Sequence, residues 1–163
     1  MILRSAEIRP GQTGHEAGRE LLEKMYRELM GAPMPPIAIG DRGKPYFTEG
    51  DLHFSISHTP RHVFCAVAEH TVGVDAEERN RVVNLKLADK ILSPQERDQY
   101  EHAEDKPLAL LTFWVLKEAA AKCSGEGLRG YPANTNFSLE DHRVTEKDGC
   151  LVAVIEERRE NYV

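Results

Sequence analysis

The sequence of 163 residues has few cysteines, no long hydrophobic run and no excess of positive charge. Its longest uncharged apolar stretch, residues 108–116, is far too short to span a bilayer. The three cysteines are scattered without a Cys-x-x-Cys pair, so we expect reduced cytoplasmic thiols and no zinc site. The formal net charge of −6 argues against a nucleic-acid-binding protein that relies on its overall charge.

The N-terminus has no basic region followed by a long apolar run, so we expect no secretory signal and a cytoplasmic protein without a membrane partner. The composition, 40% hydrophobic and 29% charged, is ordinary for a globular protein, and the length suffices for a core without disulfides. We therefore expect a single domain over residues 1–163, with an N-terminal half of about 1–80 and a C-terminal half of about 81–163.

Hydrophobic spacing and turn residues predict an α+β protein in which each half has one long helix and a few antiparallel strands. The strand Thr71–Glu77 is expected to pair with its predecessor across a tight connection at Glu69–His70. A final hairpin is expected around residues 147–149. The predicted helices are Gly14–Met30, Leu85–Leu92, one starting with the cap Ser93, and Lys106–Cys123, closed by Gly125 and Gly127. The predicted strands are Ile2–Ile8, Ile37–Ile39, His53–Ser57, Val63–Ala68, Thr71–Glu77, Asn136–Val144 and Cys150–Arg158.

Two carboxylates, Asp75 and Glu77, stand two positions apart on one predicted strand. Side chains at this spacing point the same way, about 7 Å apart at Cα, and can converge on one cation. The apolar residues that alternate with the two carboxylates along the strand then point to its opposite, buried face. An Asp-x-Glu pair alone also fits an ordinary solvated strand face, so the pair needs support from elsewhere in the chain.

That support comes from the helix predicted over Lys106–Cys123. Leu111, Val115, Glu118 and Lys122 fall on one stripe of this helix, which indicates that the two charges face a cleft. The alternative is a surface Glu–Lys pair, worth about 0.2–0.5 kcal/mol to the helix. Lys117 is rotated to another face, where it serves either as a surface cation or in packing.

Three carboxylates without a cysteine cluster favour a hard cation, Mg²⁺ first and Mn²⁺ as a substitute. Mg²⁺ commonly binds a few carboxylates together with substrate phosphates, so the pattern anticipates a phosphate-bearing substrate. Lys122, His58 and Lys44 could balance the charge of such a substrate. Ser57 is expected to act as a hydrogen-bond donor, because no Gly-x-Ser-x-Gly elbow surrounds it.

Four segments in order resemble the 4′-phosphopantetheinyl transferases, above all the surfactin-synthetase-activating type. They are Gly43–Pro45, Phe54–Thr59, Val72–Glu77 and Trp114–Lys122. The stretch Lys117–Leu128 also resembles the signature shared with the smaller holo-acyl-carrier-protein synthases. Each motif alone is weak, but the four in order cover over half of the chain.

The resemblance implies a fold of two pseudo-repeated halves, each a long helix packed on a small antiparallel sheet, with the active site in the cleft between them. It implies that coenzyme A donates its 4′-phosphopantetheine arm to a serine of an apo acyl or peptidyl carrier protein, and that adenosine 3′,5′-bisphosphate leaves. It favours a pseudo-dimeric monomer, while the small size leaves a homo-oligomer open.

The resemblance also implies roles for individual residues. Asp75, Glu77 and Glu118 would hold Mg²⁺ against the pyrophosphate, and Glu118 would act, directly or through water, as the base for the incoming serine. Lys122 would contact the transferring phosphate. The residues expected around coenzyme A are Ser57 and His58 at its phosphates and Lys44 and Pro45 at its nucleotide.

Two features depart from the family pattern. The N-terminal half is short, so that none of Arg9, Arg19 and Arg27 can be aligned with the basic residues that often grip the 3′-phosphate of coenzyme A. Ala76 stands where a larger aliphatic residue is more usual, which should affect packing and not ligation.

A basic segment directly after the predicted strand Thr71–Glu77, which carries two of the candidate metal ligands, is the expected docking surface for the acidic carrier protein. Its residues are Arg79, Arg81, Lys86 and Lys90, and the alternative is a solvated, salt-bridged surface.

Two other functions stay open. A metal-dependent nuclease also uses Asp, Glu and Lys, although its common signature places the Lys two residues after the Glu on a strand. A non-catalytic homologue that binds the carrier protein or coenzyme A is the other.

Overall fold

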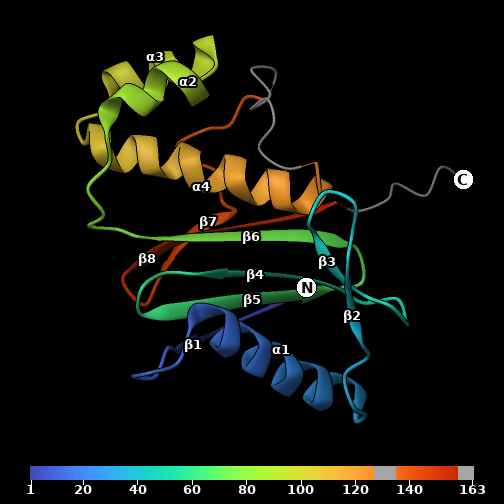
Figure 1. Cartoon of the computed structure of the whole chain (residues 1–163). Coiled ribbons are helices and arrows are strands. Elements are labelled where there is room, and N and C mark those ends of the chain that lie inside the picture. Colours follow the sequence, from blue (N-terminus) through green and yellow to red (C-terminus); the bar gives the residue numbers. More distant parts are fainter. Residues whose placement is uncertain (127–134, 158–163) are drawn as a thin grey trace, which may run out of the picture.

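The computed structural model describes residues 1–126 and 135–157 and confirms an α+β protein with small antiparallel sheets (Figure 1). The strands are β1 (Ile2–Glu7), β2 (Ile37–Ile39), β3 (Pro45–Phe47), β4 (His53–His58), β5 (His62–Ala68), β6 (Thr71–Glu78), β7 (Val144–Lys147) and β8 (Cys150–Glu157). The helices are α1 (Gly14–Met30), the 3₁₀ turn Leu85–Leu87, α2 (Ala88–Ile91), α3 (Pro94–His102) and α4 (Lys106–Ser124). None of these helices is both long and apolar enough to cross a bilayer.

The N-terminal part of the chain packs α1 on a three-stranded sheet of order β1-β5-β4. The helix has the predicted bounds because both of its ends are capped. The Thr13 side chain accepts a hydrogen bond from the Glu16 amide, and Gly31 closes the last turn at φ 61°. Leu22 and Met25 on its buried face meet Val63 and other apolar residues of the sheet.

The C-terminal part packs α4 on a second sheet of order β6-β8-β7, with α2 and α3 on the outer side of the helix (Figure 1). Asp105 caps the start of α4. Gly125 ends the helix at φ 72°, as predicted. Ser93 and Glu96 form the predicted capping box of α3. Gly127 lies outside the described residues.

Three predictions about the strands need correction. Thr71–Glu77 was predicted to pair with the preceding strand, which is wrong, because β6 pairs antiparallel with β8. Side chains of β5 and β6 instead share one buried cluster that includes Phe64 and Val74. The final hairpin starts at Val144 and not at Asn136. Its turn was correctly placed, with Asp148 and Gly149 both at positive φ. The short strand β3, paired with β2, was missed.

Strands β4 and β6 lie beside one another in parallel but belong to different sheets. We call their contact the β4–β6 junction, formed by Ser55, Ser57, Val74 and Ala76. The Val74 amide donates to Ser55 Oγ at 3.0 Å, and the Ala76 amide donates to Ser57 Oγ at 3.1 Å. In this junction, side-chain hydroxyl oxygens therefore accept the amide hydrogen bonds that backbone carbonyls would accept within a sheet.

Lys117 and Glu96 form an ion pair of 2.8 Å whose two side chains are fully buried. The packing role is the one that the structure shows for Lys117, and the surface role is wrong. The Glu96 carboxylate also accepts hydrogen bonds from the backbone amides of Ser93, at 2.8 Å, and Phe137, at 2.9 Å. The pair thus joins α3, α4 and the segment that leads to β7.

Replacing Lys117 with methionine should cost about 3–5 kcal/mol of unfolding free energy, because the Glu96 carboxylate would stay buried without a counter-charge. Urea denaturation measures this loss. The double variant Glu96→Gln/Lys117→Met removes both charges and should be more stable than the single Lys117→Met variant. Equal stability of the two variants would contradict this account.

The three cysteines, Cys65, Cys123 and Cys150, are free and buried. Burial raises the pKa of the Cys65 thiol to about 12, so this side chain stays protonated and unreactive near neutral pH.

Candidate functional site

The site begins with an unusually close contact between β6 and α4. A Cβ atom on Gly73 would lie 2.0 Å from the Ala119 carbonyl oxygen and 2.4 Å from the Cys123 amide nitrogen. Only glycine allows the two backbones to approach in this way. The contact brings Asp75 of β6 to Lys122 of α4, whose Nζ lies 2.9 Å from Asp75 Oδ1.

Asp75 and Glu77 lie on one face of β6, as predicted, and Val72, Val74 and Ala76 are buried on the other. Asp75 Oδ1 accepts hydrogen bonds from Lys122 and, at 3.3 Å, from Ser57 Oγ. Asp75 Oδ2 is buried and has no hydrogen-bond partner among the described residues. A buried carboxylate oxygen without a partner is costly. Burial raises the pKa of Asp75 for this reason, while Lys122 acts in the opposite direction.

Glu77 is partly buried and has two neighbours. Its Oε1 accepts a hydrogen bond from Trp114 Nε1 at 3.3 Å and forms an ion pair with Arg81. Burial raises the pKa of Glu77, and Arg81 opposes that effect. Arg81, which was predicted to belong to the docking surface, therefore forms an ion pair with a candidate metal ligand.

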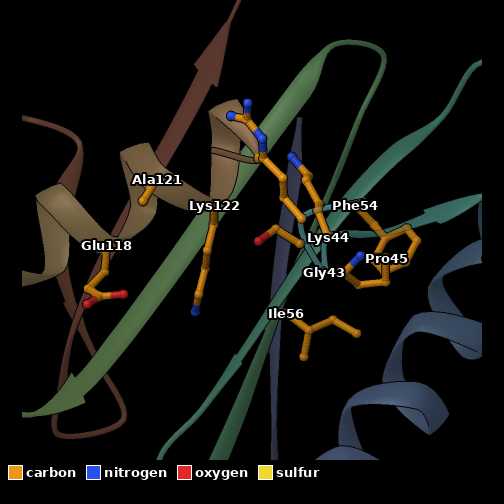
Figure 2. Close-up of a pocket in the computed structure, with 11 residues that line it drawn as sticks. Gly43, Lys44, Pro45, Phe54, Ile56, Glu118, Ala121 and Lys122 are labelled. Carbon is orange, nitrogen blue, oxygen red and sulfur yellow. The ribbon is translucent and has the colours of Figure 1, made fainter. Parts of the chain in front are cut away.

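Glu118 and Lys122 project from one side of α4 toward the strands, as the predicted stripe requires (Figure 2). They line a pocket together with Lys44, which precedes β3, and Pro45, the first residue of β3. Lys44 Nζ donates to the carbonyl of Val72 at 3.2 Å and to that of Cys123 at 2.9 Å. These bonds attach the loop before β3 to β6 and α4, and burial lowers the pKa of Lys44.

The other two predicted residues, Ser57 and His58, are neighbours on β4 but differ in burial. Ser57 is buried in the β4–β6 junction, with its hydroxyl directed to Asp75. His58 is exposed at the end of β4, where its ring lies against Gly14 at the start of α1. Neither is among the described residues that line the pocket. The structure thus joins Asp75, Lys122 and Ser57 directly and leaves His58 apart from them.

Sequence reasoning missed Arg42, which lines the pocket beside Gly43 and Lys44. The signal was present, because residues 41–45 (Asp-Arg-Gly-Lys-Pro) have the composition of a turn and carry two basic side chains. Two of the arginines considered instead are engaged elsewhere: Arg9 pairs with Glu20 at 2.8 Å and Arg27 with Glu23 at 3.2 Å. The apolar side of the pocket, also missed, consists of Phe54, Ile56 and Ala121.

Within residues 1–126 and 135–157, no three His, Cys, Asp or Glu side chains form a group that could hold a metal ion. The case for a divalent cation rests on Asp75, whose buried Oδ2 has no partner in this part of the chain. Glu77 of β6 and Glu118 of α4 are the carboxylates predicted from the sequence to complete an all-oxygen ligand set. Such donors suit Mg²⁺ and Mn²⁺.

The fold and the site define an α+β protein with a pocket of mixed carboxylate and basic side chains between α4 and the loop before β3. A family model described as the 4′-phosphopantetheinyl transferase superfamily matches residues 71–159, more than half of the chain. The chain belongs to this superfamily, as the resemblance predicted.

Individual relatives agree with the family match. The chain is 32% identical over 119 residues to a 4′-phosphopantetheinyl transferase of Bacillus subtilis, which covers 71% of this chain and 50% of that protein. It is 30% identical over 115 residues to the 4′-phosphopantetheinyl transferase gsp of Aneurinibacillus migulanus, with 68% and 48% covered. For the transferase HetI of a Nostoc species, the identity is 29% over 122 residues, with 69% and 52% covered. The chain spans about half the length of the curated relatives that it matches.

Proposed function

We propose that the protein transfers the 4′-phosphopantetheine arm of coenzyme A to a serine of an apo acyl or peptidyl carrier protein. The observation that carries the proposal is the Asp75–Lys122 contact, which leaves Asp75 Oδ2 without a partner in the described structure, beside the pocket of Glu118. The names of the relatives support the same reaction. The activity would reside in one cytoplasmic domain, residues 1–163, in which two pseudo-repeated halves form a pseudo-dimeric monomer.

In this reaction the serine oxygen attacks the phosphorus that bears the pantetheine arm. The bond from that phosphorus to the bridging pyrophosphate oxygen breaks, and adenosine 3′,5′-bisphosphate leaves. Glu118 takes the serine proton, directly or through water. Lys122 neutralises charge on the transferring phosphate, because its Nζ already stands beside Asp75 at the pocket.

Asp75, Glu77 and Glu118 would hold Mg²⁺, with Mn²⁺ as a substitute. When bound, the cation stabilises negative charge on the pyrophosphate. Without it, three carboxylates would repel an anionic substrate. The buried Oδ2 of Asp75, partnerless among the described residues, supports this assignment.

The coenzyme A site would use residues of the pocket and its rim. Lys44 and Pro45 line the pocket and would contact the nucleotide. His58, exposed at the end of β4, would contribute to binding the phosphates. Ser57 could donate to a phosphate only by releasing Asp75, because a hydroxyl has one proton.

The proposal is tested by incubating a panel of apo carrier proteins with coenzyme A, with Mg²⁺ or with a chelator, and measuring intact carrier mass. A metal-dependent gain of one phosphopantetheine group is expected. Coenzyme A binding without transfer to any carrier would instead favour the non-catalytic homologue. Absence of both binding and transfer would overturn the proposal.

Arg42 offers a separate test of substrate binding. We propose that its guanidinium contacts the 3′-phosphate of coenzyme A, because it lines the pocket while Arg9 and Arg27 pair with carboxylates of α1. Arg42→Ala should raise KM for coenzyme A about tenfold and leave KM for 3′-dephospho-coenzyme A unchanged. Equal effects on the two substrates would show that Arg42 does not read the 3′-phosphate.

The docking surface predicted for the carrier protein is Arg79, Arg81, Lys86 and Lys90, all of them exposed. Arg79 and Arg81 line a groove together with Arg61 and Leu108. Because Arg81 pairs with Glu77, Arg79 is the cleaner probe, although it pairs with Glu146 at 3.1 Å.

Charge reversal at Arg79 tests this surface. Arg79→Glu should raise KM for the carrier several-fold, more so at low salt, and spare KM for coenzyme A. Lys24→Glu makes the same change of charge on the exposed side of α1 and serves as the control. Equal KM values for the carrier in the two variants would remove Arg79 from the docking surface.

A further inference from the structure

Two serines of β4 occupy equivalent positions in the β4–β6 junction. Ser55 and Ser57 are two residues apart, so they lie on one face of the strand, and both are buried. Each hydroxyl accepts one backbone amide of β6, from Val74 at 3.0 Å and from Ala76 at 3.1 Å. By these bonds alone, the two serines would have the same structural role.

Among the described residues, the two serines differ in one hydrogen bond, and Ser55, unlike Ser57, also lines the pocket. Ser57 Oγ also donates to Asp75 Oδ1 at 3.3 Å, so its single proton is committed to that carboxylate. Lys122 Nζ donates to the same oxygen at 2.9 Å. Two donors on Oδ1 fix the plane of the carboxylate and leave the buried Oδ2 without a partner among the described residues.

We propose that Ser57 is a positioning residue that sets the rotation of the Asp75 carboxylate, so that Oδ2 is presented to a divalent cation. The inference rests on the proposed function, in which Asp75 holds Mg²⁺. The final torsion of an aspartate is broad and has no sharp minimum of its own. Lys122 alone holds it poorly, because its side chain is flexible and 34% exposed. The rigid, buried hydroxyl of Ser57 supplies the missing constraint.

Loss of a hydrogen bond that orients a metal ligand commonly weakens metal binding ten- to a hundredfold. We therefore expect Ser57→Ala to weaken Mn²⁺ binding by that factor. Ser55→Ala is the matched control, because it removes the equivalent bond to the β6 backbone without touching Asp75. Each variant loses one hydrogen bond to the β6 backbone, so an effect of that loss alone would weaken Mn²⁺ binding in both variants.

The experiment measures Mn²⁺ affinity of the full chain by electron paramagnetic resonance, without coenzyme A, beside urea denaturation of each variant. Ser57→Cys and Ser55→Cys, which keep the side-chain shape but replace the hydroxyl with a larger, weakly donating thiol, carry the same comparison if an alanine variant does not fold. Tight Mn²⁺ binding by the wild type and the Ser55 variant, with weak binding by the Ser57 variant, supports the proposal.

Two results would overturn the inference, and they differ in what else they affect. If the wild type binds Mn²⁺ and both serine variants bind it equally, Ser57 has no positioning role, while the proposed function stands. If the wild type itself binds no Mn²⁺, the metal of the proposed function is wrong as well. The carrier-mass assay with a chelator then shows whether transfer proceeds without a metal.

Discussion

Glu118→Gln should reduce phosphopantetheine transfer by about 10²–10⁴-fold, because glutamine can neither accept the serine proton nor bind a cation with full charge. The change is close to isosteric, so the fold should survive at a position where the side chain is almost fully buried. Initial rates from intact carrier mass measure the loss. Glu23→Gln on the exposed face of α1 removes a remote carboxylate and should leave the rate unchanged.

The same variant separates the two roles proposed for Glu118. If the side chain acts mainly as a metal ligand, raising the Mg²⁺ concentration should restore part of the rate. If it acts mainly as the base, saturating Mg²⁺ should leave the rate low. A rate close to that of the wild type at every Mg²⁺ concentration would remove Glu118 from the site.

Gly73→Ala should destabilise the protein by more than about 3 kcal/mol. The added Cβ would lie 2.0 Å from the Ala119 carbonyl oxygen and 2.4 Å from the Cys123 amide nitrogen. Both atoms belong to the backbone of α4, so no side chain can rotate away, and the helix itself would have to move off β6. Urea denaturation measures the change, and transfer activity should fall with it because Asp75 and Lys122 would separate.

Gly11→Ala is the control for this prediction. Gly11 has φ +80°, and a Cβ added to it would meet no atom of the described residues within 4 Å. The variant therefore tests left-handed backbone strain without crowding. Its expected cost is about 1–2 kcal/mol. If Gly73→Ala cost no more than Gly11→Ala, the close approach of β6 and α4 would be wrong.

Local signals predicted the helices well. The bounds of α1 follow from Thr13 and Gly31, which cap a regular apolar stripe, and these signals lie within the segment itself. The pairing of Glu118 and Lys122 on one side of α4 was readable for the same reason, because helical period and spacing fix it.

Non-local partners could not be predicted. The strand β6 follows β5 after a short connection, which reads as a hairpin, yet its hydrogen-bond partner is β8 near the end of the described chain. Lys117 reads as exposed by hydropathy, and its burial depends on contacts with distant residues, above all the ion pair with Glu96 of another helix. The proximity of Asp75 to Lys122 depends on the same long-range packing.

The β4–β6 junction has a consequence for self-association. β4 and β6 are each an edge strand of their own sheet. The free backbone groups of an unprotected edge strand can pair with a strand of another molecule. In the junction the two edges lie against each other, and the amides of Val74 and Ala76 already donate hydrogen bonds to the serine hydroxyls. A chain cut between β5 and β6 and separated would expose both strands at once. The two fragments would then be prone to aggregate by adding strands from neighbouring copies, so the junction also keeps the molecules apart.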